Sequence, residues 1–294
     1  MKKITVGILT YNHEAFIEKC LSSVLALQYD NLEIIVSDDC SKDNTFQIVK
    51  ALVEKSKSSH SVIIHKNEVN VGLAENFNKI FHELATGEFL ITLGGDDLII
   101  ENYLDEAVDY FNADKDLMMI DLNAVVIDEL DNVKGNATFL PVPEKVNTLD
   151  NYLALDNILS FAPGRIFRND LIKKFNPISP ACPTEDSVLV VRALLLGKLC
   201  RLDKKVIHYR KHSTNISSID NLRKLSNIRI IAQYIKDAVH LYDGLFFSDA
   251  EILAILRRFK YELRRREIFY SYDNEYIKRI KLNIHKRSYL LKLK

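Results

Sequence analysis

The first hundred residues alternate short apolar runs with amphipathic stretches, a pattern that predicts strands joined by helices. The runs expected to form strands are ITVGILT (4–10), LEIIVS (32–37), SVIIHK (61–66) and EFLITL (88–93). Continuous runs rich in β-branched residues are typical of strands that are buried on both faces. The pattern therefore indicates a sheet that is covered on both sides.

Helical spacing of apolar residues predicts three helices between these strands, at residues 14–27, 44–53 and 73–84. Successive strands begin roughly 28 residues apart, which leaves room for a helical crossover between parallel neighbours. The sequence therefore predicts an α/β fold with a mainly parallel, Rossmann-like central sheet flanked by helices.

The pattern changes beyond residue 103. We expect a helix to about residue 111, a strand at 118–127, a polar connection at 128–145 and mainly helical structure from residue 221 onward. One stripe of apolar residues is expected along that last segment, comprising Leu222, Leu225, Ile228, Ile231, Ile235, Ala238 and Val239. The predicted organisation is a domain at 1–217 and a helical C-terminal extension at 218–294.

Composition is that of an ordinary globular protein, and the charges are unevenly placed. The chain has 294 residues and no net charge, yet residues 257–294 carry 13 Lys or Arg against 4 Asp or Glu. The four cysteines form no C-x-x-C pair, so neither a zinc site nor a disulfide framework is indicated. Polar residues come too early for a signal peptide, and no run is apolar enough for a membrane span. We therefore expect a soluble protein in a reducing cytosol.

The basic C-terminal segment leaves two interpretations open. Aromatic and aliphatic residues interleave the basic ones, as in a helix lying on an anionic membrane surface. A solvated helix that packs its apolar stripe on the main domain would give the same pattern. Nucleic acid is not an expected partner, because the rest of the chain is acidic and carries no recognisable binding motif.

Polar clusters follow the predicted strands at their carboxyl ends. They are TYNH (10–13), SDDCS (37–41) and GGDD (94–97), and NVGLAENFN (70–78) follows the third strand. Open α/β sheets bind ligands at this edge. We therefore expect these segments to form one site.

Asp96 and Asp97 are the strongest candidates for metal ligands. Adjacent carboxylates repel each other, and their partial burial is costly unless a cation or hydrogen-bond donors compensate. Such ligands suit Mg²⁺ or Mn²⁺, which take their remaining oxygens from water and phosphates. One of the two could instead cap the following helix, but the preceding glycine pair favours the metal.

Two other carboxylate pairs have alternatives of the same kind. Asp38 and Asp39 lie where a carboxylate could accept the imide N–H of uracil or thymine, with Tyr11 stacked on the ring; the alternative is a turn that caps a helix. Glu185 and Asp186 open an apolar helix, where a carboxylate could accept a proton from a hydroxyl. Their alternative role is favourable charge at a helix N-terminus.

The order of these motifs resembles the family-2 glycosyltransferases with the GT-A fold. The segments that carry the resemblance span about residues 1–217: VGILTYNHEAFIEKCLSSVL, EIIVSDDCSKDNT, NVGLAENFN, GEFLITLGGDDLI, APGRIFRND, PTEDSVLVVRAL and HYRKHSTNIS. The resemblance implies that Thr10, Tyr11 and Asp39 contact the nucleobase. It further implies that Asp96 contacts the ribose or the metal and that Asp97 binds the metal.

Three further roles come from the same resemblance. Asp186 would be the catalytic base, and His212 would approach the metal or the diphosphate. Gly164 matches a glycine near the donor sugar, where a side chain would block close approach. The sequence departs from the family at Cys40, which replaces a glycine, and Lys79 is the only basic residue after the N-x-G element.

The resulting hypothesis is a metal-dependent inverting glycosyltransferase. It would use Mn²⁺ or Mg²⁺ and move one sugar from a nucleotide-diphosphate sugar, with UDP favoured, to a hydroxyl of a glycan or lipid-linked glycan in surface polysaccharide synthesis. The Q-x-x-R-W motif of processive synthases is absent, which favours single transfer. The expected place is the cytoplasm, peripheral to the inner face of the cell membrane. The alternatives are an inactive GT-A-like module that binds glycans or partners, and a sugar nucleotidyltransferase.

Overall fold

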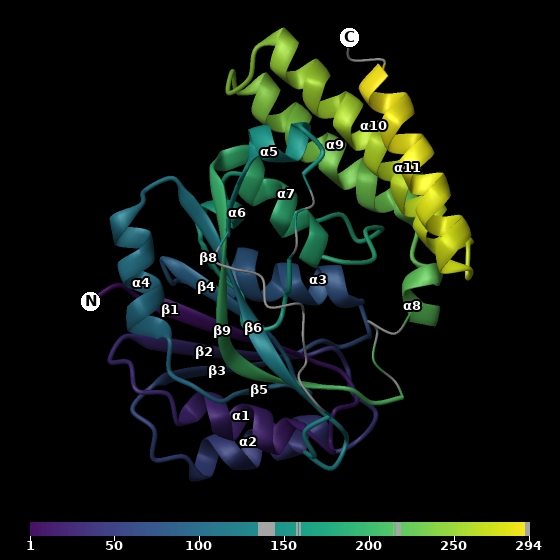
Figure 1. Ribbon diagram of the computed structural model, residues 1–294. Coiled ribbons are helices and arrows are strands. Elements are labelled where there is room, and N and C mark those ends of the chain that lie inside the picture. The colour runs from purple at the N-terminus through teal and green to yellow at the C-terminus, as the bar shows by residue number, and fades with distance from the viewer. Residues whose placement is uncertain (135–144, 157, 159, 214, 216–218, 292–294) are drawn as a thin grey trace.

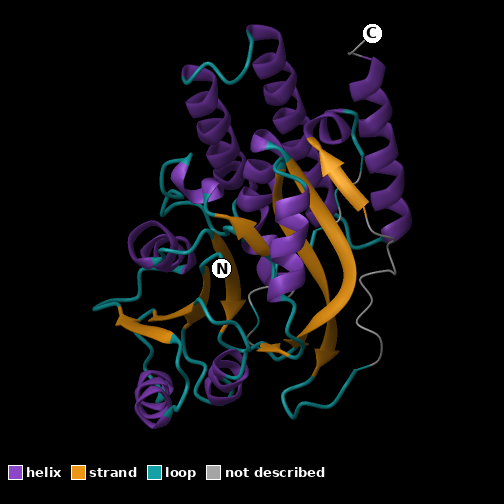
Figure 2. Cartoon of the chain, turned by 90° about the vertical axis from the view of Figure 1, so that its left-hand side faces the viewer, coloured by secondary structure: helices purple, strands orange, loops and turns teal. Residues whose placement is uncertain are grey.

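The computed structural model describes residues 1–134, 145–156, 158, 160–213, 215 and 219–291, and Figure 1 shows its arrangement. A sheet of nine strands forms its centre within these residues, with helices on both faces. Figure 2 shows the long helices of the C-terminal part standing together at one end of this sheet. The expected α/β class is confirmed.

The first half of the sheet is parallel. Its strands are β1 (Ile4–Thr10), β2 (Leu32–Asp38), β3 (Ser61–Lys66) and β4 (Phe89–Gly94). They lie in the order β3-β2-β1-β4, and every neighbouring pair is parallel. The four predicted strands are thus confirmed to within one residue, because their apolar runs are bounded sharply by polar loops.

The second half of the sheet mixes directions. Its strands are β5 (Leu98–Ile99), β6 (Leu117–Ile127), β7 (Lys145–Thr148), β8 (Ile166–Arg168) and β9 (Lys198–Arg210). β8 pairs antiparallel with both β4 and β6, whereas β6 and β9 run parallel. β5 and β7 are antiparallel partners of β9. The long strand β9 therefore connects the edge of the sheet to the turn that follows β4.

Helices cover the two faces of the sheet. They are α1 (Ile17–Leu25), α2 (Thr45–Lys55), α3 (Leu73–Asn78), the π-helix η1 (Lys79–Leu84), α4 (Leu104–Ala113), α5 (Leu149–Leu153), α6 (Asp170–Lys173), α7 (Asp186–Leu196), α8 (Ile219–Lys224), α9 (Asn227–Asp243), α10 (Asp249–Ser271) and α11 (Glu275–Leu291). The single helix expected at 73–84 is an α-helix that continues as a π-helix. Figure 1 places α1 and α2 on the opposite side of the sheet from α7 and α9.

Alternate side chains of the strands pack into two separate hydrophobic cores, one on each face of the sheet. Ile4, Val6 and Ile8 of β1 pack with α1 and α4, whereas Leu9 of the same strand joins the core that contains α3 and α7. This alternation follows from the two-residue period of a strand. The molecule is therefore a three-layer structure with the sheet in the middle.

The C-terminal helices belong partly to the second core. Buried side chains of α9 and α10 pack in one cluster with those of α7; they are Ile230, Ile231, Tyr234, Ala238, Leu241, Ile252, Ile255 and Phe259. The expected helical extension is confirmed as helical. The expected boundary at 217/218 lies outside the described residues.

The stripe expected at residues 222–239 is wrong in part. Ile231 and Ala238 are buried, but Ile228, Ile235 and Val239 are exposed. A break separates the two helices: α8 ends at Lys224, and the Ser226 side chain accepts the N–H of Arg229 at the start of α9. Within α9 the buried face is centred on Ile230, Tyr234 and Leu241, so the expected stripe meets it only along one edge, at Ile231 and Ala238.

No helix within the described ranges has both the length and the apolar character needed to cross a membrane.

Candidate functional site

The loops after β1 and β2 meet at the carboxyl edge of the sheet. The Asp39 N–H donates to the Thr10 carbonyl oxygen at 2.9 Å. Thr10 Oγ1 lies 3.2 Å from His13 Nδ1, and both side chains face the turn after β4. The Tyr11 side chain is 37% exposed, which leaves its ring accessible. The two segments expected at a nucleobase therefore lie side by side.

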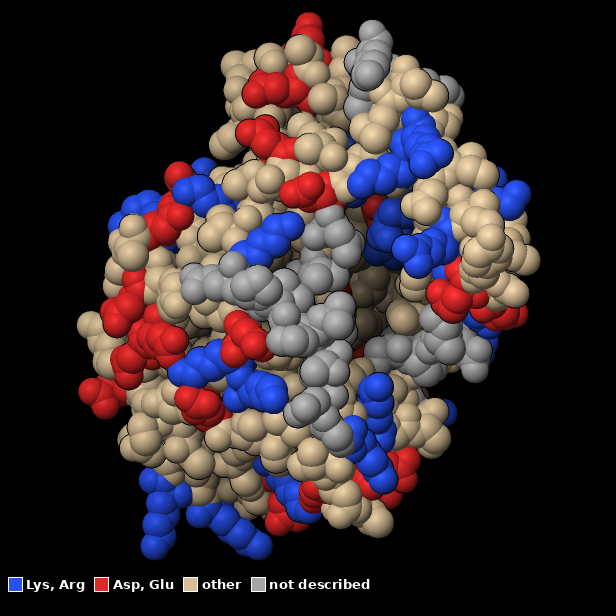
Figure 3. All heavy atoms as spheres, in the orientation of Figure 1, with Lys and Arg blue, Asp and Glu red and all other residues tan. Residues whose placement is uncertain are grey.

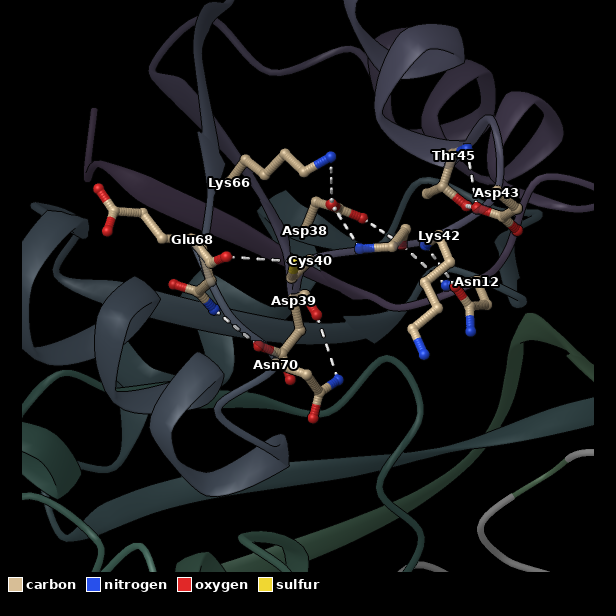
Figure 4. Close-up of polar contacts among 12 residues, drawn as sticks. Asn12, Asp38, Asp39, Cys40, Lys42, Asp43, Thr45, Lys66, Glu68 and Asn70 are labelled. Atoms are coloured by element: carbon tan, nitrogen blue, oxygen red, sulfur yellow. Dashed lines mark hydrogen bonds and ion pairs between the residues drawn. The ribbon is translucent and has the colours of Figure 1, made fainter.

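Asp39 holds the loop that follows β3. Its Oδ1 accepts the N–H of Val71 and the side-chain amide of Asn67, and its Oδ2 accepts the N–H of Gly72, each at 2.9 Å. Asn70 donates back to the Asp39 carbonyl oxygen, as Figure 4 shows. Asp39 is thus buried and shapes this edge of the site. Its contact with a nucleobase stays a prediction.

Asp38 points away from Asp39 in Figure 4 and stabilises the turn after β2. Its carboxylate accepts the N–H and the hydroxyl of Ser41, and Lys66 lies 3.8 Å away. This is the turn role that the sequence left open. Cys40, between them, has a φ of 61°, in the left-handed region that favours glycine. The chain therefore keeps a glycine-like turn there in spite of its cysteine.

The turn after β4 carries the two acidic residues expected at a metal. Asp97 Oδ1 accepts the N–H of Arg210 at 2.9 Å, and Asp96 Oδ2 lies 2.9 Å from His212 Nε2. Asn215 donates to the same Asp96 oxygen. His212 therefore lies against this turn and is bonded to Asp96, and its approach to a metal or a diphosphate stays a prediction.

Arg210 connects this acidic turn to its surroundings. Its Nε donates to the Asp96 carbonyl oxygen and its Nη1 to the Asp128 carbonyl oxygen, both at 2.9 Å. Its Nη2 pairs with Asp131 at 2.6 Å, and its guanidinium lies over the Phe16 ring. The side chain is almost completely buried. Arg210 thus stabilises the conformation of the acidic turn that carries Asp96 and Asp97.

The two adjacent carboxyl groups differ in their affinity for protons. Burial raises the pKa of Asp97 well above its ordinary value, and the neighbouring Asp96 carboxylate raises it further. Burial is the largest single influence on Asp96 and acts to raise its pKa, but the hydrogen bond to His212 and the positive charges of His13 and His212 together outweigh it, and that pKa is lowered. Burial lowers the pKa of the nearby His13. Burial and the Asp96 carboxylate thus disfavour the ionised form of Asp97, and a bound cation would stabilise that form.

The donor set fits a divalent cation. The oxygens not bonded to Arg210 or His212, Asp97 Oδ2 and Asp96 Oδ1, lie 3.7 and 2.6 Å from the place where a Gly94 Cβ would stand. The glycine leaves a space toward which both oxygens face. Within the described residues, no group of three or more His, Cys, Asp or Glu side chains is placed to hold a metal alone. Ions that use few protein carboxylates and several phosphate oxygens, such as Mg²⁺ and Mn²⁺, suit this arrangement.

A second cluster surrounds the start of α7. Arg165 Nη1 donates to the Asp186 carbonyl oxygen at 2.9 Å, and its Nε pairs with Asp121 Oδ1 at 2.8 Å. Arg165 Nη2 donates to the Ser160 hydroxyl, and Asp121 also accepts the N–H of Phe161. Arg165 is buried, so this fork holds the first turn of α7 against β6.

Asp186 and Glu185 form a protonation pair. Burial, and then the Asp186 carboxylate, raise the pKa of Glu185 well above its ordinary value. Burial also raises the pKa of Asp186, but Arg165 and a hydrogen bond to Glu185 oppose that rise. Both carboxyl groups thus have a raised pKa, and Arg165 is the positive group that favours the ionised form of Asp186.

Gly164 needs to be glycine for two reasons. Its φ is 71°, and a Cβ there would lie 2.4 Å from Ile207 Cγ1 on β9. Its carbonyl oxygen accepts the Tyr103 hydroxyl at 2.8 Å. The constraint seen here is packing against β9, and a role near a donor sugar stays a prediction.

The expected residues thus form two groups. Thr10, Tyr11, Asp39, Asp96, Asp97 and His212 surround the carboxyl ends of β1, β2 and β4. Gly164 and Asp186 lie at the second cluster, and β9 runs between the groups, with Ile207 at one and Arg210 at the other. Sequence reasoning missed His13, Arg165 and Arg210. The two arginines lie in segments already singled out, but their burial leaves no mark in the sequence pattern.

Comparison with known proteins gives a family match over more than half of the chain. The model of glycosyl transferase family 2 matches residues 5–174. An uncharacterized glycosyltransferase of Nostoc sp. is 26% identical over 246 residues, which cover 80% of this chain and 75% of that protein. Poly(ribitol-phosphate) beta-N-acetylglucosaminyltransferase TarS of Staphylococcus aureus is 26% identical over 217 residues, 71% of this chain but only 35% of TarS.

Two solved structures share the fold. The crystal structure of S. aureus TarS residues 1–349 in complex with UDP-GlcNAc has a TM-score of 0.65 at 22% identity, covering 90% of this chain and 72% of that one. The mannosyltransferase PcManGT from Pyrobaculum calidifontis, in complex with GDP-Man and Mn²⁺, has a TM-score of 0.57 at 14% identity, covering 99% and 85%. The GT-A fold expected from the sequence is confirmed.

Proposed function

Because this chain is a glycosyltransferase that belongs to glycosyl transferase family 2, we propose that it moves one sugar from a nucleotide-diphosphate sugar to an acceptor hydroxyl with inversion at the anomeric carbon. The observation that carries the proposal is the placement of the acidic turn and the Thr10–Asp39 loops at one edge of the sheet. This edge is where α/β sheets bind nucleotides.

The donor is proposed to be a UDP-sugar. The accessible Tyr11 ring would stack on the base, with Thr10 and Asp39 beside it, and Asp96 would face the ribose or the metal. TarS was crystallised with UDP-GlcNAc, which supports UDP, whereas the structure of PcManGT contains GDP-Man. The particular sugar is left open by this proposal.

Asp97 and His212 are the proposed metal site, with Asp96 between them. The oxygens of Asp96 and Asp97 that face the Gly94 space would hold Mn²⁺ or Mg²⁺. A cation there would supply positive charge to the diphosphate as it leaves. His212 would orient Asp96 and reach the diphosphate, since its ring already bonds that carboxylate.

Asp186 is the proposed catalytic base. In its ionised form, which the charge of Arg165 favours, Asp186 would accept the acceptor's hydroxyl proton as that oxygen attacks the anomeric carbon. The bond from the anomeric carbon to the diphosphate breaks with its electrons on the diphosphate. Gly164 leaves the loop next to Arg165 free of a side chain.

The acceptor is proposed to be a glycan or a lipid-linked glycan in surface polysaccharide synthesis. The cytoplasmic face of the cell membrane is the proposed place of reaction, in keeping with the basic segment 257–294. We further propose that residues 1–217 contain the donor and acceptor sites and that 218–294 support them.

The test is a pair of assays on Asp186→Asn. We expect transfer, and slow hydrolysis of the nucleotide-sugar, to fall by about a hundredfold or more, the range typical of a lost general base. Binding of UDP with Mn²⁺, followed by calorimetry, should stay within about twofold. Unchanged turnover would refute the base assignment, and failure of every nucleotide-sugar to bind would refute the donor site.

A further inference from the structure

The described part of segment 257–294 contains the end of α10 and the whole of α11, and the basic side chains of these two helices differ in their surroundings. In α10, Arg258, Arg265 and Arg266 all pair with the buried Glu262, and Arg264 pairs with Glu267. Phe259 and Tyr261 of this helix are buried. Four of the six basic side chains of α10 are thus held in ion pairs, and two of its aromatic side chains pack inside the fold.

The inner face of α11 packs on α10. The His285 ring stacks on that of Tyr261 at 4.4 Å, and the Tyr289 ring lies 4.8 Å from it. Lys278 is buried and lies over the Phe269 ring at 4.7 Å. These contacts fix the rotation of α11 about its axis.

The outer face of α11 combines exposed apolar and basic side chains. Ile277, Ile280 and Ile284 are 42%, 40% and 58% exposed, and Leu291 continues their stripe. At helical spacing, Lys281 and Arg287 fall on the two sides of this stripe. Within the described residues, neither takes part in an ion pair, and both are exposed.

We infer that this outer face of α11 is a docking surface for an anionic lipid bilayer. An apolar stripe with one positive charge on each side, Lys281 and Arg287, matches acyl chains between anionic headgroups. A second copy of the chain fits less well, because a symmetric pairing of this face would bring Lys281 and Arg287 of the two copies toward one another.

The position of α11 relates this surface to the proposed site. Asp273, in the turn between α10 and α11, pairs with Arg223 of α8. Asn221 of α8 donates to the Asn215 carbonyl oxygen, and Asn215 donates to Asp96. Figure 3 shows Lys and Arg gathered where the C-terminal helices border the hollow in this face of the molecule. A bilayer on α11 would therefore lie beside the proposed site, so the inference deepens the proposal of a lipid-linked acceptor and rests on it.

The experiment is vesicle flotation of the full chain without substrates, using phosphatidylcholine vesicles with and without phosphatidylglycerol. The test variant is Ile277→Gln/Ile280→Gln/Ile284→Gln. The matched control is Ile228→Gln/Ile235→Gln/Val239→Gln on α9, whose residues are similarly exposed at 68%, 39% and 37%. Glutamine keeps helix propensity, and these exposed changes should leave thermal unfolding unaltered.

We expect the unaltered chain to bind anionic vesicles only, and the α11 variant to bind about tenfold or more weakly. The α9 variant should bind like the unaltered chain. Absence of binding by the unaltered chain, or an equal loss in the α9 variant, would overturn the inference. So would a dimer that the α11 variant dissociates while vesicle binding persists. Nucleotide-sugar hydrolysis in solution should be the same in all three proteins, so a failure here is distinct from failure of the proposed function.

Discussion

At the scale of single residues, Asp97 has the most strongly perturbed environment of the proposed donor site. Its carboxyl group is buried next to Asp96, and both effects raise its pKa. The N–H of Arg210 is its one hydrogen-bond donor among the described residues. Ionisation of the Asp97 carboxyl group should therefore depend on a cation bound beside it.

Asp97→Asn tests this dependence with little change of shape, because an amide oxygen can still accept the Arg210 N–H. We expect Mn²⁺-dependent binding of UDP to weaken about tenfold or more, as is typical when a metal site loses a partner. Isothermal titration with and without EDTA measures the effect. Equal affinities of variant and unaltered chain in Mn²⁺ would contradict the metal assignment.

Arg165 is expected to set the pH range in which Asp186 works. Its positive charge opposes the rise in the pKa of Asp186, so its removal should raise that pKa. A base must be ionised to act, so the acidic limb of the rate profile should move to higher pH in Arg165→Gln, by roughly one unit. Glu185 and Asp121 are the other ionisable groups facing Asp186.

The comparison variants separate charge from structure. Arg165→Lys keeps the charge but loses the fork to Asp121 and Ser160, and its acidic limb should stay near that of the unaltered enzyme. Arg165→Gln/Asp121→Asn removes both buried charges and avoids leaving Asp121 unpaired. If the acidic limb of the rate profile moves neither in Arg165→Gln nor in Arg165→Gln/Asp121→Asn, the charge of Arg165 does not set the pKa of Asp186.

At the scale of elements, α9 and α10 act as part of the catalytic fold. Their buried apolar side chains share one core with α7, the helix that begins at Asp186. Arg192 of α7 pairs with Asp237 of α9 at 2.7 Å, and both are buried. These helices therefore support the first turn of α7.

Two truncations should behave differently for this reason. Ending the chain at residue 217 removes the eight apolar residues that α9 and α10 contribute to this core. The six Ile, Leu and Phe side chains among them are each worth about 1.5–3 kcal/mol, which together approach the whole stability of a domain. That protein should aggregate or unfold. Ending the chain at residue 274 removes only α11, and thermal unfolding should shift by a few degrees at most. Circular dichroism measures both, and a folded 1–217 fragment would contradict the shared core.

The parallel half of the sheet could be predicted because each strand is a compact apolar run with polar ends. The second half could not, because β5 and β8 have only two and three residues and depend on β9 and β4 for partners. Asp96, Asp97 and Asp186 stood out because carboxylates are unusual next to apolar runs. Arg165 and Arg210 did not, because their roles come from distant contacts with Asp121, Asp128 and Asp131.

At the scale of the whole molecule, one sheet divides two cores and links them. β1 contributes to both, so loosening either core exposes side chains of the same strand. The nucleotide edge of the sheet and the start of α7 are thereby coupled through shared packing. We expect a single cooperative unfolding transition.

Differential scanning calorimetry tests this expectation. A nucleotide-sugar with Mn²⁺ at about 100 times its Kd should raise the whole transition by roughly 5 °C, because a ligand of the native state stabilises every element that unfolds with it. Two separate peaks, with only one shifted by ligand, would show that the C-terminal helices unfold independently.

Arg210 has a consequence for what happens between catalytic cycles. A guanidinium anchored at Asp96, Asp128 and Asp131 is a permanent counter-charge that does not leave with the product. After the nucleotide departs, Asp96 and Asp97 still have a positively charged neighbour. We therefore expect the turn that carries them to keep its conformation. The enzyme can then receive its next donor into a pocket that is already assembled.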